Sequence, residues 1–233
     1  MATYVLLHGS GSNSWYWHRV APELRSRGHD VVAPDLPIGD ESAGLVEYAD
    51  AVRAAIGERR DVVLVAQSLA GFVAPLVCEH VPVGLMVLVT AMVPKPGESP
   101  GEWFANTGWS EARREQAERD GREVGDEVAV LTEFFHDVPD DVVAEAFRRP
   151  EPIQAEAPFA QPWPLDSWPD VPTRFVLCRH DRFFPADFMR HVVHERLGIE
   201  PDELACGHLP ALGQPAELVR LLELGSALLS GRC

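Results

Sequence analysis

The stretch VVLVAQSLAG, residues 62–71, decides the fold of this chain. It begins with four consecutive apolar residues, and such a run predicts a short strand that is buried on both faces, as in a parallel sheet. The helical pattern over residues 69–79 predicts a helix directly after this strand. Ser68 therefore lies on a sharp strand-to-helix turn that lifts its hydroxyl above the edge of the sheet. The small side chains of Ala66 and Ala70 fit such a turn.

Similar apolar runs recur on both sides of this stretch and predict further strands. They lie at residues 4–7, 31–33, 85–89 and 174–177, with a weaker one at 202–205. Helical stretches alternate with them at residues 15–27, 44–58, 185–197 and 215–229. This alternation is typical of βαβ units. We therefore predict a single α/β domain over residues 1–233, with a doubly wound, mostly parallel sheet of about six strands.

The segment between the fourth and fifth predicted strands, about residues 93–171, is too long for a simple connection. Prolines mark both of its ends, and helical candidates lie between them at residues 111–120, 126–135 and 140–148. A long loop that carries its own helices is usually functional. We therefore predict a helical cap over one edge of the sheet. The alternative is a second small domain without a catalytic role.

Composition and charge exclude several classes of protein. The chain is 46% apolar and 24% charged, as in ordinary globular proteins. Its formal net charge of −16 predicts repulsion from nucleic acids and anionic membranes, so neither is expected as a partner. No transmembrane run or signal peptide is recognised, and we expect a cytoplasmic protein. The cysteines, Cys78, Cys178, Cys206 and Cys233, form no zinc-binding pattern, so no metal is expected.

Residues 65–71 (VAQSLAG) resemble the nucleophile elbow of the α/β-hydrolases, G-x-S-x-G, with alanine at both glycine positions. This resemblance identifies Ser68 as the candidate nucleophile. A serine in front of a helix is otherwise most often only an N-cap. The strand directly before the turn favours a nucleophile over a helix N-cap as the role of Ser68.

A second part of the resemblance is His8-Gly9-Ser10-Gly11 at the end of the first predicted strand. The family has an H-G-x turn at this place. The resemblance implies an oxyanion hole formed by the backbone N–H groups of Ser10 and Leu69. The alternative is a glycine-rich turn that only ends the strand. Phosphate binding is not indicated, because the sequence has neither G-x-G-x-x-G nor a Walker lysine.

A serine hydroxyl needs a general base, and the base needs an acid that holds it. The family places its catalytic histidine on a loop after the last strand, where residues 206–210 contain His208. It places the acid after the fifth predicted strand, where residues 178–182 contain Asp181. The resulting chain order Ser, Asp, His matches that of the α/β-hydrolases. An isolated aspartate after a strand is otherwise usually a turn residue.

The opening of the chain indicates a branch within this superfamily. The segments HGS at residues 8–10 and WYW at residues 15–17 resemble the opening of the plant methylesterase and hydroxynitrile lyase branch, which has bacterial esterase-like members. Hydroxynitrile lyases of this type carry a threonine in place of His8 and a lysine after the catalytic histidine. This chain has His8 and Leu209 at these positions, which disfavours a lyase.

The resemblance therefore implies a serine hydrolase. We expect a carboxylesterase that acts on a small or medium, apolar or aromatic ester through a Ser-His-Asp triad and an acyl-enzyme, without a cofactor. One alternative is a small-molecule receptor on the same fold that does not turn its ligand over. Another is a different enzyme with the same triad: a C–C hydrolase, an acyltransferase or a hydroxynitrile lyase-like enzyme.

Aromatic residues concentrate in the predicted cap and around the predicted acid. The candidate pocket residues are His8, Trp15, Trp103, Phe134, Phe135 and His136. The same aromatic residues could instead fasten the cap to the sheet. Cys206 is either sensitive to thiol reagents or a buried small residue. The sequence indicates no oligomeric state.

Overall fold

A computed structural model describes residues 1–125, 127–150 and 153–230, and contains a six-stranded sheet. The strands are β1 (Thr3–Leu7), β2 (Asp30–Val32), β3 (Val62–Gln67), β4 (Val83–Val89), β5 (Thr173–Cys178) and β6 (Asp202–Leu204). They lie in the order β2-β1-β3-β4-β5-β6, and each neighbouring pair is parallel. The predicted α/β class and the six-stranded parallel sheet are confirmed.

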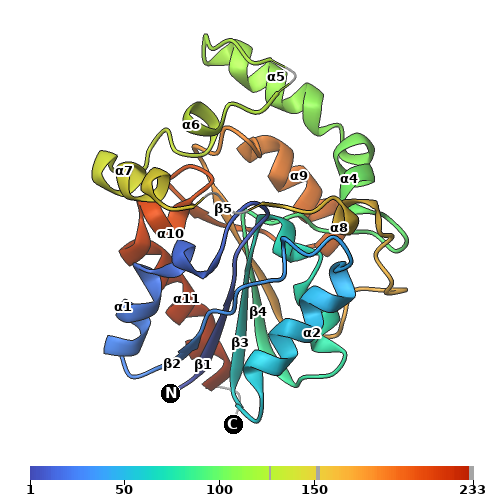
Figure 1. Cartoon of the computed structure of the whole chain (residues 1–233), viewed down its shortest axis with the longest axis vertical. Coiled ribbons are helices and arrows are strands. Elements are labelled where there is room, and N and C mark those ends of the chain that lie inside the picture. The colour runs from blue at the N-terminus through green and yellow to red at the C-terminus, as the bar shows by residue number, and fades with distance from the viewer. Residues whose placement is uncertain (126, 151–152, 231–233) are drawn as a thin grey trace.

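Helices cover both faces of this sheet (Figure 1). One face carries α1 (Val20–Ser26) and α11 (Pro215–Ser230), and the other carries α2 (Leu45–Ile56), α3 (Ala74–Cys78) and α9 (Ala186–Leu197). Along β3 the side chains alternate between two cores, with Leu64 in one and Val63 and Val65 in the other. This double burial explains why the strands read as continuous apolar runs.

Two predicted helices are each divided into a short 3₁₀ turn and an α-helix. The segment at 15–27 becomes η1 (Ser14–Trp17) and α1, and the segment at 69–79 becomes η2 (Ser68–Gly71) and α3. Proline causes both divisions, because it lacks an N–H and fits only the first turn of an α-helix. Pro22 and Pro75 lie in the first turns of α1 and α3. No helix of the described residues is long and apolar enough to cross a membrane.

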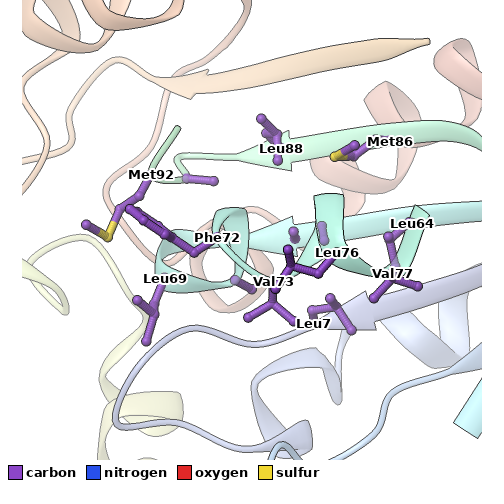
Figure 2. Close-up of a cluster of buried hydrophobic side chains, with 14 of the residues drawn as sticks. Leu7, Leu64, Leu69, Phe72, Val73, Leu76, Val77, Met86, Leu88 and Met92 are labelled. Carbon is purple, nitrogen blue, oxygen red and sulfur yellow. The ribbon is translucent and has the colours of Figure 1, made fainter. Parts of the chain in front are cut away.

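The segment after Ser68 packs tightly onto the sheet (Figure 2). Phe72, Val73 and Val77 are fully buried and belong to the same core as Leu64 and Leu88. Full burial of each such side chain contributes about 1.5–3 kcal/mol. The turn that carries Ser68 is therefore held by a large apolar contact on one face of the sheet.

Five helices lie between β4 and β5 in the described part of the chain, and Figure 1 shows them gathered beyond one end of the sheet. They are α4 (Pro100–Thr107), α5 (Trp109–Arg119), α6 (Val130–Glu133), α7 (Asp140–Arg148) and α8 (Ala157–Ala160). The helix predicted at 126–135 is shorter, and Asp126 lies outside the described residues. The unpredicted α4 and α8, like α10 (Pro210–Gly213), carry proline in the first turn, where it is tolerated.

Buried polar contacts hold this segment between β4 and β5 together and attach it to the loop after β5. The Arg113 Nε atom donates to Glu133 Oε2 at 2.6 Å, and both side chains are almost fully buried. This ion pair joins α5 to α6. The Trp109 Nε1 atom donates to the Phe183 carbonyl at 2.6 Å, which joins α5 to the loop after β5. The cap therefore has fixed contacts with the loop that carries Asp181.

Candidate active site

Ser68 follows directly on the last residue of β3 and has a φ of 54°. A positive φ is unfavourable for a residue with a Cβ atom, and such strain is concentrated at functional sites. Ala66 and Ala70, on either side of this turn, are fully buried. The turn holds the half-buried Ser68 side chain at the wall of a large cavity.

The structure brings Ser68, His208 and Asp181 together. The His208 Nε2 atom lies 3.2 Å from Ser68 Oγ, and its Nδ1 atom lies 2.8 Å from Asp181 Oδ2. A carboxylate accepts hydrogen bonds, so the Nδ1 atom is the one that carries the proton and Nε2 can accept the serine hydroxyl proton. Asp181 is fully buried and His208 is almost fully buried. The three residues follow β3, β5 and β6, whose carboxyl ends meet at one edge of the sheet.

Further hydrogen bonds fix the orientation of the Asp181 carboxylate. The backbone N–H groups of Phe183 and Phe184 each donate to Oδ1 at 2.9 Å. The Thr90 hydroxyl donates to Oδ2 beside His208. The sequence interpretation missed Thr90, although it directly follows β4 at the same edge of the sheet as the predicted nucleophile. These three donors thus hold the carboxylate in the position in which it contacts the imidazole.

Aromatic rings surround the His208 imidazole. The ring centroids of Phe134, Phe183 and Phe184 lie 5.0, 5.1 and 5.2 Å from its centroid. Phe134 comes from the cap, whereas the other two belong to the loop after β5. The side chain of Gln67, the last residue of β3, donates to the His208 carbonyl at 3.2 Å. These contacts shield the histidine from water and hold it toward Ser68.

The turn at residues 8–11 lies close to Ser68. Ser10 and Leu69 both line the cavity beside Ser68. Within the described residues, the backbone N–H of neither Ser10 nor Leu69 donates to a protein group. A Cβ atom on Gly9 would lie 2.8 Å from the Ser68 Cβ and also clash with Gln67, so only glycine allows this close approach. Both N–H groups that the resemblance assigns to an oxyanion hole are thus available.

His8 holds this turn from the side of the protein interior. Its ring is fully buried, the Leu36 N–H donates to Nε2 at 3.1 Å, and Nδ1 lies 2.9 Å from the Gly9 carbonyl. Since Nε2 accepts a hydrogen bond, the proton is on Nδ1, which donates to Gly9. Burial lowers the pKa of His8. His8 is therefore a neutral histidine that links the turn to the loop after β2.

We expect His8 to make the fold sensitive to acid. Below an ordinary histidine pKa of about 6.5 the unfolded chain binds a proton that the folded chain, with its lowered pKa, does not. The free energy of unfolding should therefore decrease as the pH falls below this value, by at most about 1.4 kcal/mol per pH unit, and level off below the folded pKa. When urea unfolding is measured at several pH values across this range, the free energy of unfolding should fall less steeply with decreasing pH for His8→Asn than for the wild type. The control is the same substitution at the exposed His191. If the free energy of unfolding of His8→Asn depended on pH as steeply as that of the wild type, the assignment would be contradicted.

The cavity beside Ser68 has a volume of about 880 Å³ and mostly apolar walls. None of the described residues that line it is an Asp or a Glu, although the chain is strongly acidic overall. Its lining includes Ser10, Trp15, Tyr16, Ser68, Leu69, Met92, Phe104, Phe134, Phe135, Phe159, Phe183, Phe184, His208, Leu209 and Leu212. Three of the candidate pocket residues, Trp15, Phe134 and Phe135, are among these lining residues.

Three other candidate pocket residues lie elsewhere. His8 is buried beneath the turn at residues 8–11. Trp103 is fully buried and donates from Nε1 to the Val93 carbonyl at 3.0 Å, so it fastens α4 to the segment after β4. The His136 Nε2 atom lies 3.0 Å from the His180 carbonyl, outside the cavity lining. Each of these side chains makes a hydrogen bond with the backbone that holds it away from the cavity.

Two buried cysteines lie near Asp181 and His208. The Cys206 Sγ atom is 3.3 Å from the Cys178 Sγ atom, and both residues are 1% exposed. Burial raises the pKa of the Cys178 thiol well above its ordinary value. Cys206 therefore has the environment of a buried small residue, and Cys233 lies outside the described residues. Within the described ranges no three His, Cys, Asp or Glu side chains are grouped as metal ligands would be.

The sheet order and the serine on the turn after its third strand define an enzyme of the α/β-hydrolase class. The family model described as "Alpha/beta hydrolase family" matches residues 4–221, and the chain belongs to this family. This match confirms the resemblance found in the sequence.

Similar proteins cover nearly the whole chain. Norfluorocurarine synthase 1 of a Strychnos species is 24% identical over 249 residues, covering 94% of this chain and 93% of that protein. Polyneuridine aldehyde esterase of Rauvolfia serpentina is 24% identical over 246 residues, with the same coverage. Among solved structures, a pyrethroid hydrolase of Sphingobium faniae JZ-2 has a TM-score of 0.75 at 20% identity and covers 97% of both chains.

Proposed function

We propose that this protein is a serine carboxylesterase that hydrolyses small or medium esters with an apolar or aromatic acyl group. The observation that carries the proposal is the chain of hydrogen bonds from Ser68 through His208 to Asp181, which ends at an apolar cavity. The names of similar proteins include an esterase and a hydrolase, and these names support ester hydrolysis.

The first half of the reaction forms an acyl-enzyme. Ser68 Oγ attacks the ester carbonyl carbon while His208 Nε2 takes the hydroxyl proton. Asp181 holds the Nδ1–H group and stabilises the imidazolium. The N–H groups of Ser10 and Leu69 donate to the oxyanion of the tetrahedral intermediate, where each such donor typically contributes about 3–4 kcal/mol. The carbonyl then re-forms, and the alcohol leaves with the proton from Nε2.

The second half releases the acid. A water molecule gives a proton to His208 Nε2 and attacks the acyl carbon, and the oxyanion forms again at the same two N–H groups. Collapse of this intermediate breaks the bond to Ser68 Oγ, which recovers its proton from the imidazolium. The side chains and backbone groups of this chain suffice for every proton transfer.

The properties of the cavity favour a substrate with an apolar acyl or alcohol group. Its volume of about 880 Å³ lies in the range of roughly 300–1,000 Å³ that is typical of small-molecule sites. The aromatic side chains around it offer flat apolar walls, with Phe134 and Phe183 next to the histidine. No carboxylate of the described chain lines the cavity, and the guanidinium of Arg149, which does line it, lies over the Trp15 ring at 5.1 Å from the ring centroid.

A series of p-nitrophenyl esters tests this function. We expect kcat/KM to rise from acetate through butyrate to hexanoate, by at most about fourfold per methylene, since a buried methylene contributes about 0.8 kcal/mol. Release of both nitrophenol and free acid identifies hydrolysis. Saturable binding without acid release would favour a receptor instead. Transfer of the acyl group to an added alcohol would favour an acyltransferase. A kcat/KM that falls from acetate to hexanoate would contradict the apolar acyl site.

A further inference from the structure

Gln154, from the cap segment after α7, contacts the turn at residues 8–11 from the side opposite His8. Its Oε1 atom accepts the Gly11 N–H at 3.2 Å and the Ser10 hydroxyl at 3.2 Å. These two residues and Gln154 all line the cavity beside Ser68. The cap therefore makes direct hydrogen bonds with the turn that faces the nucleophile.

The environment of the Gln154 amide determines its orientation. Its Nε2 atom donates to the Ala155 carbonyl at 3.0 Å and to the Tyr48 hydroxyl at 3.1 Å. A backbone carbonyl only accepts and the Gly11 N–H only donates, so a reversed amide would lose both bonds. All polar atoms of the side chain are thus used, and the oxygen must face the turn.

The segment around Gln154 is itself anchored on the sheet domain. The Ala155 N–H donates to the Ile38 carbonyl at 2.7 Å, and Tyr48 is a fully buried residue of α2. Ile38 lies on the loop after β2, which also supplies the Leu36 N–H that contacts His8. One loop therefore supports both His8 and the Gln154 segment.

We propose that Gln154 is a positioning residue that, together with His8, holds the backbone N–H of Ser10 in place for the oxyanion; the proposal rests on the proposed esterase function. The Gly9 carbonyl and the Ser10 N–H belong to one planar peptide group, so the His8 bond to Gly9 sets the direction of that N–H. The Gln154 Oε1 atom accepts hydrogen bonds from the Ser10 hydroxyl and the Gly11 N–H. Both flanks of the peptide are then restrained, and its N–H stays available to the substrate.

The Gln154→Met variant tests this role, because methionine has a similar length but forms no comparable hydrogen bonds. Loss of one restraint misaligns a donor in the transition state, so kcat should fall about 10- to 100-fold while KM stays within about twofold. The matched control is Gln161→Met. Gln161 also ties the cap to the sheet domain, by accepting the Leu45 N–H at 2.9 Å, but it does not contact the turn.

Two further measurements separate positioning from a general loss of structure. A trifluoromethyl ketone, which forms an oxyanion on the nucleophile, should bind more weakly to Gln154→Met in proportion to the loss of kcat/KM. The amide of Gly11 should exchange with deuterium faster in this variant than in wild type or Gln161→Met. An unchanged kcat, or equal effects of both variants on kcat and on exchange, would overturn the proposal.

The exchange measurement needs no substrate and therefore distinguishes the two proposals. If the wild-type protein released no acid from any ester, the proposed function would fail. Faster exchange of Gly11 in Gln154→Met would then still support the restraint of the turn by the cap. Unaltered exchange would overturn that restraint whether or not the enzyme is active.

Discussion

Replacement of Ser68 by alanine is expected to lower kcat for p-nitrophenyl butyrate by more than about 10³-fold. The change removes the Ser68 Oγ atom, which lies 3.2 Å from His208 Nε2 and which we propose attacks the carbonyl. A fluorophosphonate probe should add once to the wild-type protein, as measured by intact mass, and should not add to the variant. KM should change little, because the serine hydroxyl contributes to the transition state rather than to the binding of the ester.

The control for this experiment is Ser42→Ala. Ser42 is an exposed serine whose hydroxyl contacts Asp40, far from the histidine in the sequence and outside the cavity lining. It should keep wild-type turnover and labelling. Alanine at position 68 has the same unfavourable positive φ as serine, so the variant should keep the wild-type fold by circular dichroism. Near-normal turnover of Ser68→Ala, or labelling elsewhere in the chain, would rule out Ser68 as the nucleophile.

The second large effect is expected for Asp181→Asn, with a loss of kcat of about 10³- to 10⁴-fold. The asparagine oxygen would remain with the N–H groups of Phe183 and Phe184, which only donate. Its NH₂ group would then face His208 Nδ1 and favour the tautomer that carries the proton on Nε2. A proton on Nε2 prevents the imidazole from accepting the proton of Ser68, although the geometry of the site is unchanged.

The matched control is Asp137→Asn, which makes the same chemical change next to the same loop. The Asp137 carboxylate accepts the N–H of Gly207, the residue before His208, and makes no contact with the imidazole among the described residues. We expect its effect on kcat to be much smaller than that of Asp181→Asn. If the two variants lost activity equally, Asp181 would act through the position of the loop rather than through the tautomer of His208.

The fold was predictable because each strand of a parallel sheet is buried on both faces. Leu64 and Val65 contribute to opposite cores, so the run to which they belong reads as continuously apolar. The turn after β3 was recognisable for a related reason, since Ala66 and Ala70 are small where the chain reverses. Carboxyl ends of parallel strands meet at one edge, and the order of Ser68, Asp181 and His208 therefore suggested their contact.

The rest of the site depends on contacts that no local pattern encodes. Thr90 donates to a residue 91 positions away, and only its place after β4 indicates a role. Gln154 lies in a proline-rich segment without periodicity, and the next residue, Ala155, donates its backbone N–H to the distant Ile38 carbonyl, a contact that no local propensity encodes. Aromatic composition likewise does not separate Phe134, which lines the cavity, from Trp103, which fastens the cap.

The strand order also divides the site into a stable and a vulnerable part. β3, which precedes Ser68, pairs with strands on both sides, whereas β6, which precedes His208, is an edge strand with a single neighbour and three paired residues. Local opening of a protein begins where few contacts must be broken. We expect thermal or chemical stress to open β6 and the loop that follows it before the central strands and their two cores. We therefore expect the proposed esterase activity to be lost through the edge of the sheet before the molecule as a whole unfolds.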